Sequence, residues 1–123
     1  MTSYSSSSFL KHAIIFLPER RSIMSYLESD FQQDLKKDLK EQLDVCEILK
    51  TDICLQGFPD LTVLLNDGRW FTLECKKSRN ASHQPNQDYY VSQCNRASYS
   101  RFVYPENKQE VLNELRETFG SPR

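Results

Sequence analysis

Apolar and polar positions alternate most clearly between residues 57 and 77, where the chain reads GFPDLTVLLNDGRWFTLECKK. The apolar runs predict two strands, Leu61 to Leu65 and Trp70 to Lys76. Asn-Asp-Gly-Arg stands between them, a composition that favours a tight turn with glycine at a positive φ. The stretch therefore predicts a β-hairpin.

An apolar period of four residues precedes the hairpin. It consists of Leu27, Phe31, Leu35, Leu39 and Leu43. This period predicts a long amphipathic helix that ends near Gln42. Ser25 and Glu28 match the capping-box pattern S-x-x-E, so we expect Ser25 at the helix start.

Shorter apolar runs supply the remaining elements. We expect a strand over about Glu47 to Cys54, a helix over about Pro85 to Asn95, a strand over Ser100 to Tyr104, and a last helix from Asn107 to Gly120 that packs on the sheet. In the middle helix, one face carries Gln87, Tyr90, Val91 and Cys94. The pattern predicts a single α/β domain with a mixed central sheet flanked by helices.

Residues 1 to 23 stand apart from this pattern. The first eight are rich in serine, which is typical of unstructured chain, and FLKHAIIFLP follows without the features of a signal peptide. Three interpretations stay open: an added strand, an arm against a second subunit, or an extension before Met24. We expect residues 1–23 to be a partly disordered extension or interface arm, and residues 24–123 to form the domain.

Composition excludes several classes of protein. A chain of 123 residues suits one domain, and a formal net charge of −1 gives no overall basic field. The four cysteines form no C-x-x-C pair and show no zinc-ligand spacing. No stretch reaches the roughly 20 apolar residues of a membrane helix. We expect a cytoplasmic protein without membrane contact, disulfides or a small organic cofactor.

The predicted hairpin brings together three charged residues that are candidates for a functional site: Asp60, Glu74 and Lys76. Glu74 and Lys76 share one face of their strand because side chains alternate. With a three-residue loop Asp60 lies opposite Glu74, and with a four-residue loop it lies opposite Cys75; either register brings the two carboxylates within roughly 4.5 to 8 Å. A divalent cation would offset their repulsion. Alternatively, Glu74 and Lys76 form a solvated pair on an edge strand and Asp60 is a turn residue.

These residues carry a family resemblance. Gly57-Phe58-Pro59-Asp60, then Glu74-Cys75-Lys76, then Gln87 resembles the pattern G-x-P-D, E-x-K, Q of the VRR-NUC branch of the PD-(D/E)XK nuclease superfamily. The resemblance covers most of residues 24 to 118 and is to stand-alone, single-domain members of phage or bacterial type. It implies an αβββαβ core and a DNA endonuclease that uses one or two Mg²⁺ or Mn²⁺ ions.

The resemblance also implies roles. Asp60 and Glu74 would be metal ligands together with the Cys75 backbone carbonyl, Lys76 would be the catalytic lysine, and Gln87 would support it. Glu28 is either a further ligand or a helix cap. Basic side chains expected to contact DNA are Lys77, Arg79, His83, Arg96 and Arg101. The alternative for this last set is scattered, solvated charge.

By analogy with stand-alone members we expect a structure-selective endonuclease that acts on branched DNA such as four-way junctions. The length leaves little room for a separate recognition domain, which favours reading of DNA shape, and a homodimer would place two sites on two strands. A phage-encoded chain would act in the host cytoplasm. Two alternatives stay open: a sequence-specific restriction or homing enzyme, and a noncatalytic nucleic-acid-binding module.

Overall fold

The computed structural model describes residues 20–121, and their side chains from residue 29 onward. By its internal contacts the chain divides into residues 1–30 and residues 31–123, and the account below concerns the second unit. Most of the extension predicted for residues 1–23 lies outside the described residues. So does the side chain of Glu28, the residue predicted to be a metal ligand or a helix cap.

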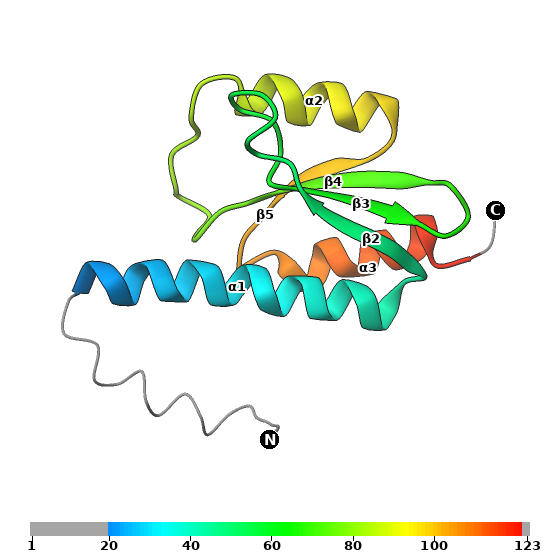
Figure 1. The fold of residues 1–123 in the computed structure, drawn as a ribbon, viewed down its shortest axis with the longest axis horizontal. Helices are drawn as coiled ribbons and strands as arrows, with labels where there is room; N and C mark the ends of the chain where they lie inside the picture. Colours follow the sequence, from blue (N-terminus) through cyan, green and yellow to red (C-terminus); the bar gives the residue numbers. More distant parts are fainter. Residues whose placement is uncertain (1–19, 122–123) are drawn as a thin grey trace. The chain divides into compact units, whose positions relative to one another are not determined.

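Three helices and four strands follow one another along the described chain (Figure 1). They are α1 (Arg20–Gln42), β2 (Val45–Lys50), β3 (Leu61–Leu65), β4 (Trp70–Cys75), α2 (Gln87–Ala97), β5 (Ser100–Val103) and α3 (Lys108–Phe119). The four strands form one sheet in the order β2-β3-β4-β5. The first two pairings are antiparallel and β4 pairs with β5 in parallel. The predicted α/β class with a mixed sheet is confirmed.

The hydrophobic core lies on one face of the sheet, beneath α3 and the part of α1 that follows Asp30. The helices contribute Leu35, Leu39, Leu43, Val111, Leu112, Leu115 and Phe119, and the strands contribute Leu61, Val63, Leu65, Phe71, Leu73, Cys75 and Val103. Helix α2 covers the other face (Figure 1). The prediction that Phe31, Leu35, Leu39 and Leu43 face the core is therefore confirmed, as is the packing of the last helix on the sheet. The side chain of Leu27, the first residue of the predicted period, lies outside the described residues.

The central hairpin adopts the first of the two predicted registers. Leu61 is opposite Leu73 and Leu64 is opposite Trp70. The Leu65 N–H donates to the Arg69 carbonyl at 2.9 Å, which leaves a three-residue loop with Gly68 at φ 95°. Continued by one residue, this register sets Asp60 opposite Glu74.

Two predicted boundaries on the N-terminal side of the hairpin are wrong. Strand β2 ends at Lys50 and not at Cys54, because the chain turns directly after Thr51, where the Cys54 N–H donates to the Thr51 carbonyl at 3.0 Å. The Thr51 hydroxyl donates to the Pro59 carbonyl at 2.8 Å and holds this turn against the start of β3. Helix α1 begins at Arg20, so Ser25 lies inside the helix and the predicted capping box is not at the helix start.

The later helices differ from prediction at their first turns. Helix α2 begins at Gln87, preceded by Asn86 with φ 71°, so Pro85 lies before the helix and not in its first turn. Asn107 does precede α3, but its side chain makes no cap. It accepts from the Tyr104 N–H at 2.8 Å and donates to the Phe102 carbonyl at 3.0 Å, which fixes the turn between β5 and α3.

A helix that crosses a membrane must be both long and apolar. From residue 20 to residue 121, no helix has both the length and the apolar character that a span requires.

Candidate functional site

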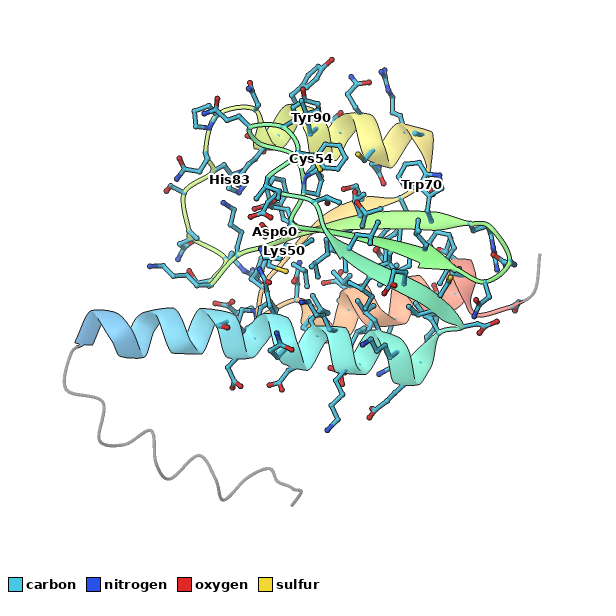
Figure 2. All side chains as sticks on the ribbon, in the orientation of Figure 1. Lys50, Cys54, Asp60, Trp70, His83 and Tyr90 are labelled. Carbon is cyan, nitrogen blue, oxygen red and sulfur yellow. The ribbon has the colours of Figure 1, made fainter. Side chains whose placement is uncertain are left out.

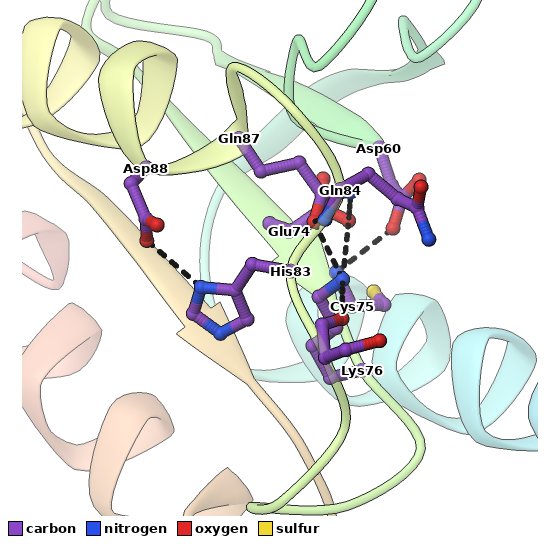
Figure 3. Close-up of polar contacts among 9 residues, drawn as sticks. Asp60, Glu74, Cys75, Lys76, His83, Gln84, Gln87 and Asp88 are labelled. Carbon is purple, nitrogen blue, oxygen red and sulfur yellow. Dashed lines mark hydrogen bonds and ion pairs between the residues drawn. The ribbon is translucent and has the colours of Figure 1, made fainter.

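Four predicted site residues come together where β3 begins and β4 ends (Figure 3). Asp60 immediately precedes β3, Glu74 lies near the end of β4, Lys76 follows β4, and Gln87 is the first residue of α2. Alternation along β4 points Glu74 and Lys76 to the face that α2 covers. Both are buried, with 3% and 9% of their surface exposed.

The side-chain amide of Gln87 bridges the two charged residues of β4. Its Oε1 accepts from Lys76 Nζ at 2.6 Å, and its Nε2 donates to Glu74 Oε2 at 2.8 Å. The Gln84 N–H also donates to Oε1, at 2.8 Å. The reversed amide would aim its NH₂ at an ammonium and at an N–H, and its oxygen at a carboxylate, so these partners allow one orientation.

Lys76 is held by acceptors on two sides. Besides Gln87, its Nζ donates to the Ser82 carbonyl at 3.0 Å. Glu74 Oε2 lies 4.0 Å away, close enough for charge attraction but too far for a hydrogen bond. An ammonium has three N–H groups. One of them therefore has no hydrogen-bond acceptor within the described chain and can be offered to an anionic ligand.

The two carboxylates differ in how they are satisfied. Asp60 Oδ2 accepts from the Cys75 N–H at 2.8 Å. Glu74 Oε1 is buried and has no hydrogen-bond partner among residues 29–121. A buried polar atom without a partner costs on the order of 1–3 kcal/mol, so its position needs a compensating ligand or proton.

Burial disfavours the charged forms of both acids, and at Glu74 the charge of Asp60 adds to this effect. Burial, and then the charge of Asp60, raise the pKa of Glu74 to about 8, against the attraction of Lys76. Burial also raises the pKa of Asp60, which the Cys75 N–H and the charge of Lys50 oppose. The pair therefore favours either a bound proton or a bound cation.

Hard oxygen donors of this kind suit Mg²⁺ or Mn²⁺. The unpartnered Glu74 Oε1 fits such an ion, and the Cys75 carbonyl belongs to the residue between Glu74 and Lys76. The Cys75 thiol points into the core and burial raises its pKa, so the sulfur is not a candidate ligand. Within the described part of the chain, no three His, Cys, Asp or Glu side chains form a metal-binding group.

Three of the predicted DNA-contacting residues lie on the loop between β4 and α2. Lys77 is exposed. The Arg79 guanidinium lies over the Tyr104 ring at 5.7 Å. The His83 ring stacks on Phe102 at 4.1 Å, and its Nδ1 lies 2.8 Å from Asp88 Oδ1. Arg79 and His83 therefore fasten this loop to β5 and α2.

The other two predicted basic residues are not gathered with the site. Arg96 lies in the last turn of α2, whereas Gln87 begins that helix. Arg101 pairs with Leu73 in the β4–β5 register, so it faces away from Glu74. It lies against Glu114 at 3.2 Å and over the Tyr99 ring at 4.3 Å. These two arginines do not surround the carboxylates.

Sequence reasoning missed three contributors to the site. The Ser82 carbonyl and the Gln84 N–H hold Lys76 and Gln87 through backbone atoms. Backbone groups of a polar loop leave no residue-type signal, so the sequence could not have identified them. Lys50, whose charge lowers the pKa of Asp60, could have been found, because β2 was expected to precede this turn.

Comparison of the chain with protein-family models, with curated proteins and with solved structures found no match.

Proposed function

We propose that this chain is a divalent-metal-dependent DNA endonuclease of the PD-(D/E)XK type. The observation that carries the proposal is the cluster of Asp60, Glu74 and Lys76 with Gln87, in which Glu74 Oε1 is buried without a hydrogen-bond donor among residues 29–121. The element order αβββαβ and the resemblance to the VRR-NUC pattern support the same assignment. Acidic pairs beside an ammonium suit phosphodiester chemistry.

Each residue of the cluster has a role in this proposal. Asp60, Glu74 and the Cys75 carbonyl would hold Mg²⁺ or Mn²⁺, as one or two ions. When bound, the metal supplies a Lewis acid that polarises the scissile phosphate and lowers the pKa of water. Lys76 directs its remaining N–H to the phosphate or to the attacking water. Gln87 holds the Lys76 ammonium in place through its Oε1 and fixes the orientation of the Glu74 carboxyl group through its Nε2.

The same proposal includes three further points: selectivity for DNA structure, a homodimeric assembly and a cytoplasmic location. The resemblance to stand-alone nucleases supports branched DNA as substrate, since their activity is on such shapes. A symmetric dimer would set one site against each strand.

Cleavage of a labelled DNA panel tests the proposal. The panel contains a linear duplex, a flap, a splayed arm, a four-way junction and a single strand, each with Mg²⁺, Mn²⁺ or a chelator. We expect metal-dependent cleavage that is strongest on the junction. Glu74→Gln and Lys76→Met should each lower the rate by about 100-fold or more, as loss of a charged transition-state contact does.

Lys40→Met is the matched control, because Lys40 is an exposed lysine on α1. It should cleave like the parent. Cleavage that persists in the chelator, or that is equal in the parent and Glu74→Gln, contradicts the proposal. Cleavage of one duplex sequence in preference to every branched form would instead identify a restriction or homing enzyme.

A noncatalytic nucleic-acid-binding module is the second candidate. It is favoured by the fact that the described residues offer two acidic side chains, rather than three, at the proposed centre. DNA binding that is indifferent to chelator, together with no cleavage of any panel member, would support this module.

A further inference from the structure

An exposed apolar tip lies between β2 and β3. The side chains of Ile53 and Leu55 are 86% and 50% exposed, and Cys54 between them is exposed as well. Scattered apolar side chains are common on protein surfaces. Here two of them project from the same turn, in the segment that leads to Asp60, the first residue of the candidate site. We refer to Ile53 and Leu55 as the apolar tip.

The turn that carries the apolar tip is held at both ends. The Cys54 N–H donates to the Thr51 carbonyl at 3.0 Å, and the Phe58 N–H donates to the Leu55 carbonyl at 3.0 Å. The Phe58 ring packs on Tyr90 of α2 with centroids 5.6 Å apart. These contacts present the tip in a fixed position, so inserting it into a partner would require little further ordering.

Gly57 allows the turn to approach the start of α2. Its φ is 89°, and a Cβ at this position would lie 2.6 Å from the Pro85 carbonyl oxygen. The tip is therefore anchored to the same end of α2 that supplies Gln87 to the site. Figure 2 labels Cys54 on the turn that carries the tip, Tyr90 on α2 and Asp60 at the candidate site.

The distance from the tip to the site is bounded by chain geometry. The Thr51 N–H donates to the Asp60 carbonyl at 2.8 Å. Ile53 is two residues further along, so its Cα lies within roughly 12 Å of that carbonyl oxygen. The tip therefore lies near Asp60, within a span of a few base steps of DNA at roughly 3.4 Å each.

We propose that the apolar tip is a wedge that inserts between bases where a DNA helix is interrupted. This inference rests on the proposed nuclease function and names the feature of DNA that the site would select. Proteins that kink DNA insert one or two apolar side chains between base steps, at a cost of a few kcal/mol per unstacked step. That cost is least where stacking is already broken, so the wedge favours branch points over continuous duplex.

A second copy of this chain is the less suitable occupant. A stable dimer interface buries about 800 Å² on each partner, and two aliphatic side chains supply only a small part of it. The turn offers one basic side chain to a phosphate. Lys50 begins the same turn with its side chain 51% exposed, and its ion pair with Asp52, at 3.3 Å, is accessible enough to give way to a phosphate.

Base unstacking at a branch point tests the wedge. The parent is the Glu74→Gln variant, which the proposed function expects to bind without cleaving, and the probe is a four-way junction with 2-aminopurine at the branch. A linear duplex of the same sequence carries 2-aminopurine at its centre. We expect the parent to raise the junction fluorescence. The double tip variant adds Ile53→Ser and Leu55→Ser to this parent and should abolish the fluorescence rise. Its affinity for the junction should fall about fivefold or more, which is the effect of losing one contact with a base.

Leu64→Ser is the matched control, because Leu64 is 37% exposed at the hairpin end of β3. It should leave fluorescence and affinity unchanged. Both substituted tip residues are exposed, so unfolding free energies should stay within about 0.5 kcal/mol of the parent. An unchanged rise in the double tip variant overturns the wedge. So does a dimeric parent that becomes monomeric in the double tip variant on sedimentation, which would assign the tip to self-association.

The failure of the wedge and the failure of the proposed function have different signatures. Mg²⁺-dependent cleavage by the unsubstituted chain, together with equal junction preference in the double tip variant, overturns the wedge alone. A fluorescence rise that needs the tip, without cleavage by the unsubstituted chain, supports the wedge and overturns the nuclease. No binding to either DNA overturns both.

Discussion

Gln87 Oε1 lies 2.6 Å from Lys76 Nζ, and the same amide donates to Glu74. A single side chain at the start of α2 thus holds both Glu74 and Lys76, which project from the same face of the chain at the end of β4. The site is assembled before any ligand arrives, because the partners of the amide determine its orientation. The cost of this arrangement is a pair of acids that are buried close to each other.

Loss of the Gln87 amide should destabilise the protein. Gln87→Leu keeps the side chain's bulk but removes the donor to Glu74 and the acceptor of Lys76, leaving buried polar groups without partners. We expect the free energy of unfolding to fall by about 1–3 kcal/mol in urea titrations. Gln93→Leu on the same helix, where the amide bonds only the exposed Arg96, is the control and should change it by less than about 0.5 kcal/mol.

The stability of the metal-free protein should fall as pH rises. The native pKa of Glu74 is raised from 4.5 to about 8, so the native state binds more protons than the unfolded state between these values. The free energy of unfolding therefore decreases through this window, by at most about 1.4 kcal/mol per pH unit, and levels off above it. Urea titrations in chelator should show this decrease in the parent.

Glu74→Gln should flatten that profile, since the amide does not titrate. Glu117→Gln, at an exposed position on α3, should keep the slope of the parent. A parent whose stability is constant or rises between these pH values would remove the argument that burial and repulsion act on Glu74.

Asp60 should respond differently to two substitutions. Asp60→Asn removes the charge but keeps an oxygen for the Cys75 N–H, so the metal-free protein should gain stability at pH 8. Asp60→Ala removes the acceptor as well and should lose about 1–3 kcal/mol relative to Asp60→Asn. Thermal unfolding in chelator gives the ranking. Asp34→Asn, on the exposed side of α1, should match the parent.

The loop before α2 should loosen when His83 is truncated. Its ring stacks on Phe102, and this loop supplies the Gln84 N–H to Gln87. An aromatic stack is worth about 0.5–1.5 kcal/mol, so His83→Ala should speed hydrogen exchange at the Gln84 amide roughly threefold to tenfold. His83→Phe keeps the stack and should retain protection. Equal exchange in all three proteins would show that the stack does not fasten the loop.

Much of the fold follows from local pattern. The apolar period of α1 and the alternation in β3 and β4 each specify a buried face, and the turn residues Asn66 to Gly68 select the register that sets Asp60 opposite Glu74. These signals are contained within a few neighbouring residues. That is why the hairpin and its carboxylates could be predicted from the sequence.

The remaining features depend on contacts between distant segments. The chain turns directly after Thr51, whose hydroxyl donates to the Pro59 carbonyl, and no feature of residues 47–54 alone indicates this turn. Arg101 was expected to contact DNA, but the parallel pairing of β5 turns it to the face opposite Glu74. The pairing of strands that are far apart in sequence decides which face a side chain occupies. The types of the residues do not indicate this pairing.

Titration of Mn²⁺ at pH 8, followed by the electron paramagnetic resonance of the free ion, tests the central claim most directly. The claim is that Asp60 and Glu74 are buried together in order to bind a divalent cation. We expect the parent and Asp34→Asn to remove free Mn²⁺ equally, and Asp60→Asn and Glu74→Gln to bind it at least about tenfold more weakly, a loss of about 1.4 kcal/mol. Equal binding by all four proteins, or no binding by the parent, would contradict the account.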